Sequence, residues 1–217
     1  RIGFAASHAA SPVAAMDEIM EQLGEAPLAG LMLFCSHRFD RDPLARAINR
    51  RSEGVSVIGC TSSGELTDRG YDEDSLSAIA FPTDSFHLAS HCFQDVDMFD
   101  PVAARDVVRN LVATATRDSR SLGEKINQVA LFLVDGLSHR EELLTMTIQD
   151  ALGDIPLIGG SSGDGLAFRE TSIFEGGQFH AHGAVVAILS TPRPLHVFKA
   201  QHYRPGAAKM VVTDAIP

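Results

Sequence analysis

Two short polar corners, 100 residues apart, hold most of the side chains in this sequence that could bind a ligand or react. Each corner follows an apolar run and combines small residues, hydroxyl groups and one acid. The first reads Gly59-Cys60-Thr61-Ser62-Ser63-Gly64-Glu65 and the second reads Gly159-Gly160-Ser161-Ser162-Gly163-Asp164. One such corner alone is typical of a tight turn, in which glycine adopts positive φ and serine satisfies nearby backbone groups. Because the corner occurs twice, we interpret both as parts of a site for a small polar ligand. The candidate ligand-binding residues in them are Cys60, Thr61, Ser62, Ser63, Glu65, Gly160, Ser161, Ser162 and Asp164.

The second corner also matches the G-x-S-x-G pattern around Ser161. In hydrolases this pattern places a nucleophilic serine on a sharp turn between a strand and a helix. Here Gly165 follows shortly afterwards and the chain leads towards another strand, so the required helix is not expected. We therefore predict a protein that is not an enzyme, and hydrolysis by Ser161 is an alternative.

A histidine-arginine pair follows the buried-type strand in each half, ahead of the corner. The pairs are His37-Arg38 and His139-Arg140. Arginine can form two parallel hydrogen bonds with a carboxylate, and histidine can donate, accept or bind a metal. Ligands of open α/β sheets bind beyond the carboxyl ends of the strands, so both pairs and both corners are expected to face one cleft. The alternative is that Arg38 and Arg140 are solvated residues near helix starts.

Another histidine pair, His180 and His182, would lie on one face of a strand, because alternate strand residues point the same way. Two imidazoles can ligate a metal, but no third potential ligand lies at a sequence spacing that is typical of a metal site. The sequence therefore predicts no metal site.

The two corners belong to a longer internal repeat. Leu31–Phe34 matches Leu131–Val134, and Ile58-Gly59 matches Ile158-Gly159, all at a separation of 100 without a gap. Such matching positions predict that one structural unit occurs twice.

The elements expected from the sequence follow the same order in each half. Ser11-Pro12 and Asp100-Pro101 each predict a helix start, because a side-chain oxygen can cap free N–H groups and proline suits the first helical position. The first half is expected to contain strands at 2–6, 28–35, 55–60 and 76–81 and helices at 12–23 and 43–51. The second half is expected to contain strands at 86–93, 129–135, 155–159, 172–174 and 182–189 and helices at 101–116 and 140–152.

Strands that alternate with helices favour an α/β fold with right-handed crossovers. We predict two similar βαβαβ(ββ) halves with mainly parallel sheets plus antiparallel hairpin strands, in a pseudo-two-fold arrangement. Residues 1–84 would form the first repeat and residues 85–190 the second. Residues 191–217 would contribute a strand and the start of a further C-terminal part.

Composition excludes several classes of protein. The formal net charge is −10 and the basic residues are scattered, which argues against a nucleic-acid partner. No apolar stretch approaches the roughly 20 residues of a transmembrane helix. The three cysteines form no CxxC pair, so neither a disulfide framework nor a zinc ribbon is indicated and a cytoplasmic location is expected.

The paired segments VIGCTSSGEL (57–66) and LIGGSSGDGL (157–166), with the duplicated frame around them, resemble the N-terminal part of the FIST sensory domain. The resemblance spans nearly the whole chain. It implies a ligand-sensing input domain of bacterial signal transduction that binds a small polar molecule, such as an amino acid, in a cleft between the repeats. It also implies a histidine kinase, a chemotaxis protein or a cyclic-dinucleotide signalling protein as partner.

Some members that the chain resembles bind haem and sense nitric oxide, so a haem-based sensor is a further alternative. The sequence contains no recognisable haem-binding motif and does not by itself establish a cofactor. The candidate axial ligands are His37, His139, His180 and His182.

Overall fold

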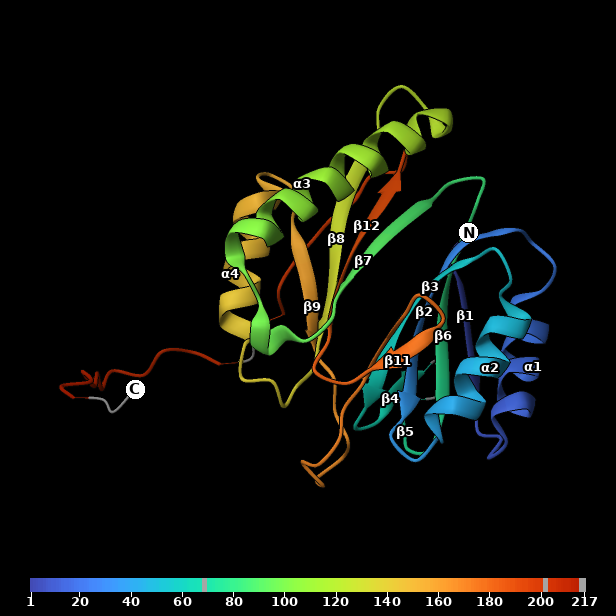
Figure 1. Cartoon of the computed structure of the whole chain (residues 1–217), viewed down its shortest axis with the longest axis horizontal. Coiled ribbons are helices and arrows are strands. Elements are labelled where there is room, and N and C mark those ends of the chain that lie inside the picture. The colour runs from blue at the N-terminus through green and yellow to red at the C-terminus, as the bar shows by residue number, and fades with distance from the viewer. Residues whose placement is uncertain (68–69, 201–202, 215–217) are drawn as a thin grey trace.

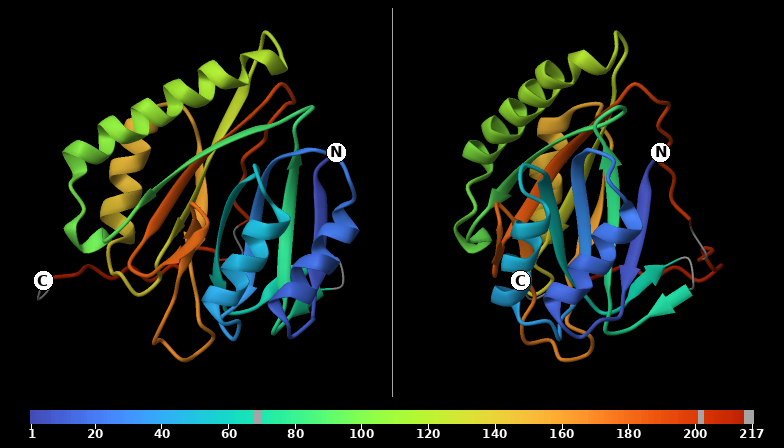
Figure 2. Two further views of the ribbon diagram at one scale, coloured as in Figure 1. Left: turned by 45° about the vertical axis from the view of Figure 1, so that its right-hand side comes forward. Right: turned by 90° about the vertical axis from the view of Figure 1, so that its right-hand side faces the viewer.

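Two β-sheets lie face to face at the centre of the protein, and a pair of helices covers the outer face of each sheet (Figure 1). This computed structural model describes residues 1–67, 70–200 and 203–214. The two helix pairs remain on opposite sides of the molecule when it is turned (Figure 2). The chain therefore folds as four layers in the order α, β, β, α.

The elements follow the order expected from the sequence. The first half contains β1 (Gly3–Ser7), α1 (Pro12–Leu23), β2 (Leu28–Ser36), α2 (Arg41–Arg51), β3 (Ser56–Ser62), β4 (Glu65–Thr67), β5 (Gly70–Asp72) and β6 (Leu76–Pro82). The second half contains β7 (His87–Phe93), the 3₁₀ turn η1 (Val96–Met98), α3 (Pro101–Asp118), the 3₁₀ turn η2 (Ser119–Leu122), β8 (Asn127–Val134), α4 (Glu141–Leu152), β9 (Leu157–Ser161), β10 (Ile173–Glu175), β11 (Gln178–His180) and β12 (Ala184–Thr191).

The first residues of the helices show which of the expected capping side chains form hydrogen bonds in the structure. The side chain of Asp100 accepts a hydrogen bond from the N–H of Val102 at 2.8 Å, and Pro101 opens α3. Ser11 occupies the corresponding position before α1 but makes no side-chain capping bond. Helix α2 begins at Arg41, two residues earlier than expected, because Asp40 accepts from the N–H of Asp42 and serves as its cap.

The two sheets share one strand pattern. The first sheet has the order β1-β6-β2-β3-β10-β11, and the second sheet has the order β7-β12-β8-β9. In both, the closing strand (β6 or β12) lies antiparallel between the first and second strands of its half, and the second and third strands pair in parallel. This shared order is compatible with a two-half repeat.

The α/β class agrees with the sequence, but the expectation of mainly parallel pairing is corrected. Among the described residues, parallel pairing joins β2 to β3 and β8 to β9, and the other paired strands are antiparallel. The physical reason is the position of β6 and β12. Each inserts between two strands that run in the same direction, so the crossover helices α1 and α3 join strands that are not neighbours.

The alignment of the two halves that the sequence suggested is also displaced by one residue at β2 and β8. Hydrogen-bond register pairs Met32 with Ile58 and Leu131 with Ile158. Met32 and Leu131 both pack between the sheets, whereas Leu31 packs against the helices of its own half. A shift of one residue reverses the face that a strand residue occupies. The ungapped separation of 100 is therefore wrong for these strands, and Met32 corresponds to Leu131.

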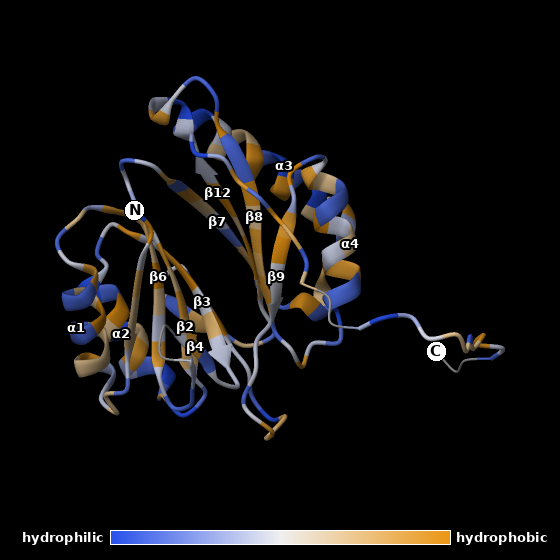
Figure 3. Ribbon diagram, turned by 180° about the vertical axis from the view of Figure 1, so that it is seen from behind, coloured by the Kyte–Doolittle hydropathy of each residue, from blue (hydrophilic) through white to orange (hydrophobic). Residues whose placement is uncertain are grey.

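Three layers of apolar side chains hold the fold together. One lies between the first sheet and helices α1 and α2, one between the two sheets, and one between the second sheet and helices α3 and α4. The hydropathy colouring shows this concentration of hydrophobic residues on the central strands (Figure 3). Burial of apolar surface contributes roughly 25 cal/mol per Å² to folding, so these layers supply most of the driving force.

The hairpin β10–β11 belongs by sequence to the second half, but β10 pairs antiparallel with β3 of the first sheet. Its counterpart, the hairpin β4–β5, forms a separate two-stranded sheet. Beyond Thr191 the described residues form no strand, unlike the strand expected within 191–217. Leu195 still packs against the layer between the sheets, and residues 203–214 lie away from them (Figure 1). Residues 201, 202 and 215–217 of that range lie outside the described part of the chain.

Candidate functional site

The two corners meet in the structure. The carbonyl of Thr61 accepts a hydrogen bond from the N–H of Gly163 at 3.0 Å. The hydroxyl of Ser63 accepts one from the N–H of Gly165, also at 3.0 Å. Segments 100 residues apart in the sequence therefore lie side by side where β3 and β9 end.

Little space remains between the corners for a ligand. A Cβ atom added to Gly163 would overlap the hydroxyl of Ser63, so the two backbones are in close contact. The hydroxyl of Ser62 contacts Glu65, and the hydroxyl of Ser162 accepts from the N–H of Gly136 at 3.2 Å. These hydroxyl groups are used within the fold, as the turn interpretation of a single corner would have it.

The acid of the first corner is a structural group. Glu65 is 2% exposed and accepts hydrogen bonds from the hydroxyl of Ser75 at 2.5 Å and from its N–H at 3.3 Å. It ties β4 to the residue before β6. The sequence indicated an acid at this position but not its burial.

The acid of the second corner organises the loop that follows it. The carboxylate of Asp164 accepts from the N–H groups of Phe168, Arg169 and Glu170 at 2.6 to 2.9 Å. Burial alone would raise the pKa of this carboxyl, but the bonds from Arg169, Glu170 and Phe168 outweigh it and hold the pKa below its ordinary value. Asp164 is therefore a charged anchor for this loop.

A further buried acid, Asp135, was not among the candidate residues. It accepts from the N–H of Leu137 at 2.9 Å, from the N–H of His182 at 2.7 Å and from the hydroxyl of Thr171. It joins the end of β8 to the loop before β10 and to the start of β12. Its signal in the sequence was a carboxylate directly after an apolar strand, a position that we interpreted only as the strand end.

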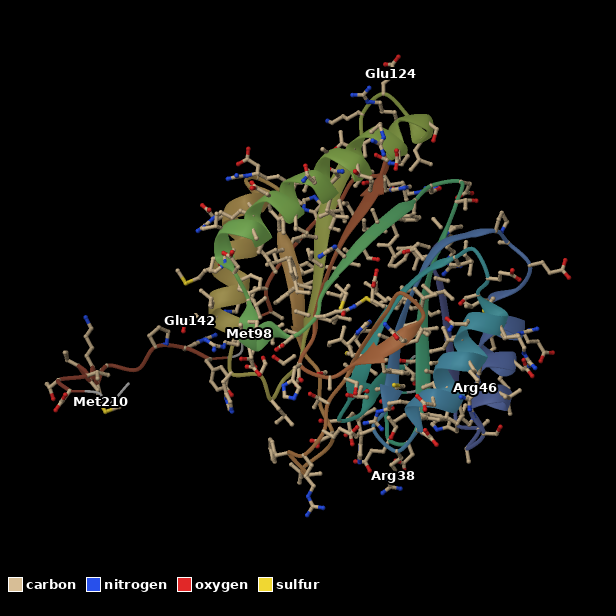
Figure 4. All side chains as sticks on the ribbon, viewed as in Figure 1. Arg38, Arg46, Met98, Glu124, Glu142 and Met210 are labelled. Carbon is tan, nitrogen blue, oxygen red and sulfur yellow. The ribbon has the colours of Figure 1, made fainter. Side chains whose placement is uncertain are left out.

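The histidine-arginine pairs separate. His37 is half-buried and adjoins the second corner, because a Cβ atom on Gly165 would lie 3.3 Å from its ring. Arg38 is exposed at the rim of the molecule and pairs with Asp74 at 2.6 Å (Figure 4). Exposed ion pairs of this kind contribute little to stability.

The second pair lies elsewhere in the structure. Arg140 is exposed and 4.0 Å from Asp97 of η1, and His139 is exposed with a φ of 54°. The described contacts thus bring His37 to the corners, whereas Arg38 and Arg140 each pair with an acid outside them.

Ser161, the candidate nucleophile, and Cys60, a candidate ligand-binding residue, have different surroundings. Ser161 is exposed at the end of β9, and residues 162–172 contain no helix, as the sequence predicted. Cys60 is buried between the sheets, and burial raises the pKa of its thiol to about 12. A thiol with that pKa is protonated and unreactive near neutral pH.

A large hollow lies beside the first corner, at the β1 edge of the first sheet. We call it the edge pocket; it has a volume of about 980 Å³. Its apolar wall includes Phe4, Phe34 and Ile79, and its polar groups include His8, Glu65, Thr67 and Asp72. Ligand pockets typically measure about 300 to 1,000 Å³ and combine apolar walls with a few polar groups.

Sequence reasoning missed the edge pocket because its walls come from β1, β2, β6 and the β4–β5 hairpin. Phe4 is 70% exposed there, which is unusual for an aromatic strand residue. Among the described lining residues, Glu65 is the one that the corners contribute as a candidate. None of the four candidate haem histidines is in that lining, which contains His8.

The architecture is that of an α/β domain with two matched sheets and a pocket at one edge. The chain belongs to the FIST N domain family, whose model matches residues 29–216. FIST domains are sensory domains of signalling proteins, so this membership supports a sensory role. No helix among the described residues is long and apolar enough to cross a membrane.

Other comparisons add little. The chain is similar to a solved structure of cyanuric acid hydrolase from A. caulinodans, with 11% sequence identity and a TM-score of 0.43. That similarity covers 88% of this chain and 70% of the hydrolase, and it is too distant to carry an argument. No curated protein matches the chain significantly.

Proposed function

We propose that the chain is a ligand-sensing domain of bacterial signal transduction that binds a small amphipathic molecule, such as an amino acid, in the edge pocket. The observation that carries this proposal is the composition of the pocket, whose lining combines aromatic and aliphatic side chains with ionisable groups. A small apolar side chain would pack against Phe4, Phe34 and Ile79.

The polar groups of the pocket suit the head of an amino acid. Asp72 accepts a hydrogen bond from the hydroxyl of Thr67 at 2.9 Å and lies 3.5 Å from the ring of His8. A ligand ammonium group would pair with the carboxylate of Asp72, and His8 would turn towards a ligand carboxylate. Charge-assisted hydrogen bonds of this kind are stronger than neutral ones.

This proposal places the ligand beside the first corner rather than between the two corners. The corners already satisfy each other's polar groups, whereas the edge pocket has both volume and exposed apolar surface. Exposed apolar surface of this kind often marks a binding site. Ligand binding would alter the packing of the β4–β5 hairpin, and a histidine kinase, a chemotaxis protein or a cyclic-dinucleotide enzyme would read that change.

Calorimetric titration against a panel of amino acids tests the proposal. For a ligand that binds, Phe4→Ala should weaken affinity by about tenfold to a hundredfold, since a buried aromatic side chain contributes roughly 1.5–3 kcal/mol. Asp72→Asn should weaken it as well, because the charge that pairs with the ammonium group is lost. Val13→Ala, which shortens an exposed apolar residue on α1, is the matched control.

The same titration distinguishes the edge pocket from the cleft expected from the sequence. Unchanged affinity in Phe4→Ala, together with a loss in Arg38→Ala or Arg140→Ala, would reject the edge pocket and favour a site that includes one of these arginines. Failure of the whole panel to bind would reject an amino acid as the ligand.

A further inference from the structure

Three potential metal ligands of different types converge where the two sheets meet. Cys92 lies on β7 of the second sheet, and Glu175 and His180 lie on the hairpin β10–β11 of the first sheet. One ligand atom from each residue lies within 4.8 Å of the other two, and all three residues are half-buried. The convergence exists only because the hairpin crosses to the first sheet and brings its two ligands against β7.

The types of ligand select the class of metal. A cysteine sulfur, an imidazole nitrogen and a carboxylate oxygen are the donors that Zn²⁺ combines in proteins, whereas Ca²⁺ and Mg²⁺ prefer oxygen donors alone. Three protein ligands leave a fourth tetrahedral position for water or another small ligand. We propose that Cys92, Glu175 and His180 form a binding site for Zn²⁺ that links the second sheet to the hairpin.

Neighbouring groups hold two of these ligands in place. The hydroxyl of Ser90 donates to the carboxylate of Glu175 at 2.8 Å. The Nε2 of His180 lies 3.0 Å from the main-chain oxygen of Glu175, and a hydrogen bond there would leave Nδ1 free to bind a metal. Ligating histidines in metalloproteins usually have such a second partner.

A surface pocket reaches Glu175, one of the three proposed ligands. A pocket of about 340 Å³ is lined by Ser90 and Glu175 and by the turn residues Gly176 and Gly177 of the hairpin. The formal net charge of −10 also favours attraction of a cation. The sequence did not reveal the site, because Cys92 is 83 positions before Glu175 and no local spacing connects them.

Titration of the chelator-treated chain with Co²⁺ tests the proposal directly, since Co²⁺ occupies zinc sites and gives a thiolate-to-metal charge-transfer absorption. We expect one Co²⁺ per chain, the charge-transfer band, and loss of the band when Zn²⁺ is added. Cys92→Ser should abolish the band. His180→Ala should weaken binding by at least about a hundredfold, because loss of an outer partner alone costs 10- to 100-fold.

Matched variants separate this site from other thiols and histidines. His182→Ala removes an exposed imidazole two positions away, and Cys60→Ala removes a buried thiol; both should retain the band. Circular dichroism confirms that each variant is folded. Absence of a band in the wild-type chain, a band that survives Cys92→Ser, or equal binding by wild type and His180→Ala would each overturn the proposal.

A second readout uses stability. Binding to the folded state alone raises the melting temperature, so Zn²⁺ should raise that of the wild-type chain and leave that of Cys92→Ser unchanged. This test does not depend on the amino-acid ligand, because Phe4→Ala should keep the zinc response whether or not the edge pocket binds anything. An equal rise in both chains would show that the ion binds elsewhere.

Discussion

Asp74 and His182 share a left-handed backbone conformation, with φ of 59° and 52°, and each stands two residues before the strand that closes its sheet. In both turns, the carbonyl of the following residue accepts a hydrogen bond at 2.9 Å. The donors are the N–H groups of Ser36 and Asp135, at the ends of β2 and β8. Two chemically different side chains therefore occupy one main-chain geometry, which the turn requires in each half.

Substitution of His182 should reveal the cost of this geometry. A left-handed conformation costs an ordinary residue roughly 1–2 kcal/mol, whereas glycine adopts it freely and loses about 0.5–1 kcal/mol of chain entropy on folding. His182→Gly should therefore leave the free energy of unfolding unchanged or raise it by up to about 1 kcal/mol. His182→Val should lower it by about 1 kcal/mol or more, because a β-branched residue suits this region least. Urea denaturation measures both, and a glycine variant less stable than the valine variant would contradict the strain argument.

Substitution of Gly159 should destabilise the fold, because the neighbouring strand leaves no room for a side chain. A Cβ atom there would overlap the main-chain carbonyl of Phe132, its partner in the parallel pair β8–β9. Gly159→Ala should lower the free energy of unfolding by about 1–3 kcal/mol, the usual cost of overpacking. Gly160→Ala is the matched control, because a Cβ atom there meets nothing within 4 Å. Equal melting temperatures for the two variants would show that the strands can separate without cost.

The charged anchor at Asp164 predicts a pH dependence. Because its pKa is lower in the folded chain than in the unfolded chain, the ionised carboxylate stabilises the fold above about pH 4. That contribution is lost as the pH falls through the folded-state pKa. Asp164→Asn should lower the free energy of unfolding at pH 7 by about 1–3 kcal/mol, since it weakens hydrogen bonds to a charged acceptor. The difference from wild type should shrink in acid. Urea denaturation over a pH series measures this, with the exposed Asp154→Asn as control; a difference that stays constant with pH would exclude the charge as its cause.

Ser161 should not react with serine-directed probes. No helix follows it to present the hydroxyl and supply an oxyanion donor. Incubation of the purified chain with a fluorophosphonate should leave it unlabelled by mass spectrometry. Labelling that Ser161→Ala removes would restore the hydrolase alternative.

The purified chain should also be colourless if the ligand is an amino acid. A Soret band in its absorption spectrum would support the haem alternative instead. Loss of that band in an alanine variant of one candidate residue would identify the axial ligand. The candidates are His37, His139, His180 and His182.

The order of the elements could be predicted because its signals are local. Asp100-Pro101 specifies a helix start by the hydrogen bonds available within four residues, and the apolar run before Gly159 specifies a strand. The insertion of β6 between β1 and β2 has no local signal, because it depends on contacts over more than 70 residues of chain. The one-residue offset between Met32 and Leu131 was hidden for a similar reason: both strands are apolar on both faces, so alternation could not fix the register.

The candidate site likewise has some features that the sequence could predict and others that it could not. Thr61, near the end of β3, and Gly163, just after β9, are joined by a hydrogen bond, so the corners meet at matching places of the two halves. The ligand cleft expected there stays a prediction. The burial of Glu65 and the pairing of Arg38 with Asp74 depend on which side chains arrive from other strands. The edge pocket depends on the position of a hairpin, which no pattern of residues along the chain specifies.

The crossing of β10–β11 to the first sheet has a consequence during synthesis of the chain. Strands β1, β6, β2 and β3 are all available once residue 82 has left the ribosome, but β10, the partner of β3, ends at Glu175. At elongation rates of about 5–20 residues per second, the edge of β3 waits roughly 5–20 s for its neighbour. An unpaired strand edge readily recruits strands from other chains. During synthesis there is therefore an interval in which the edge of β3 has no neighbour from its own chain, and this interval ends only when the hairpin emerges.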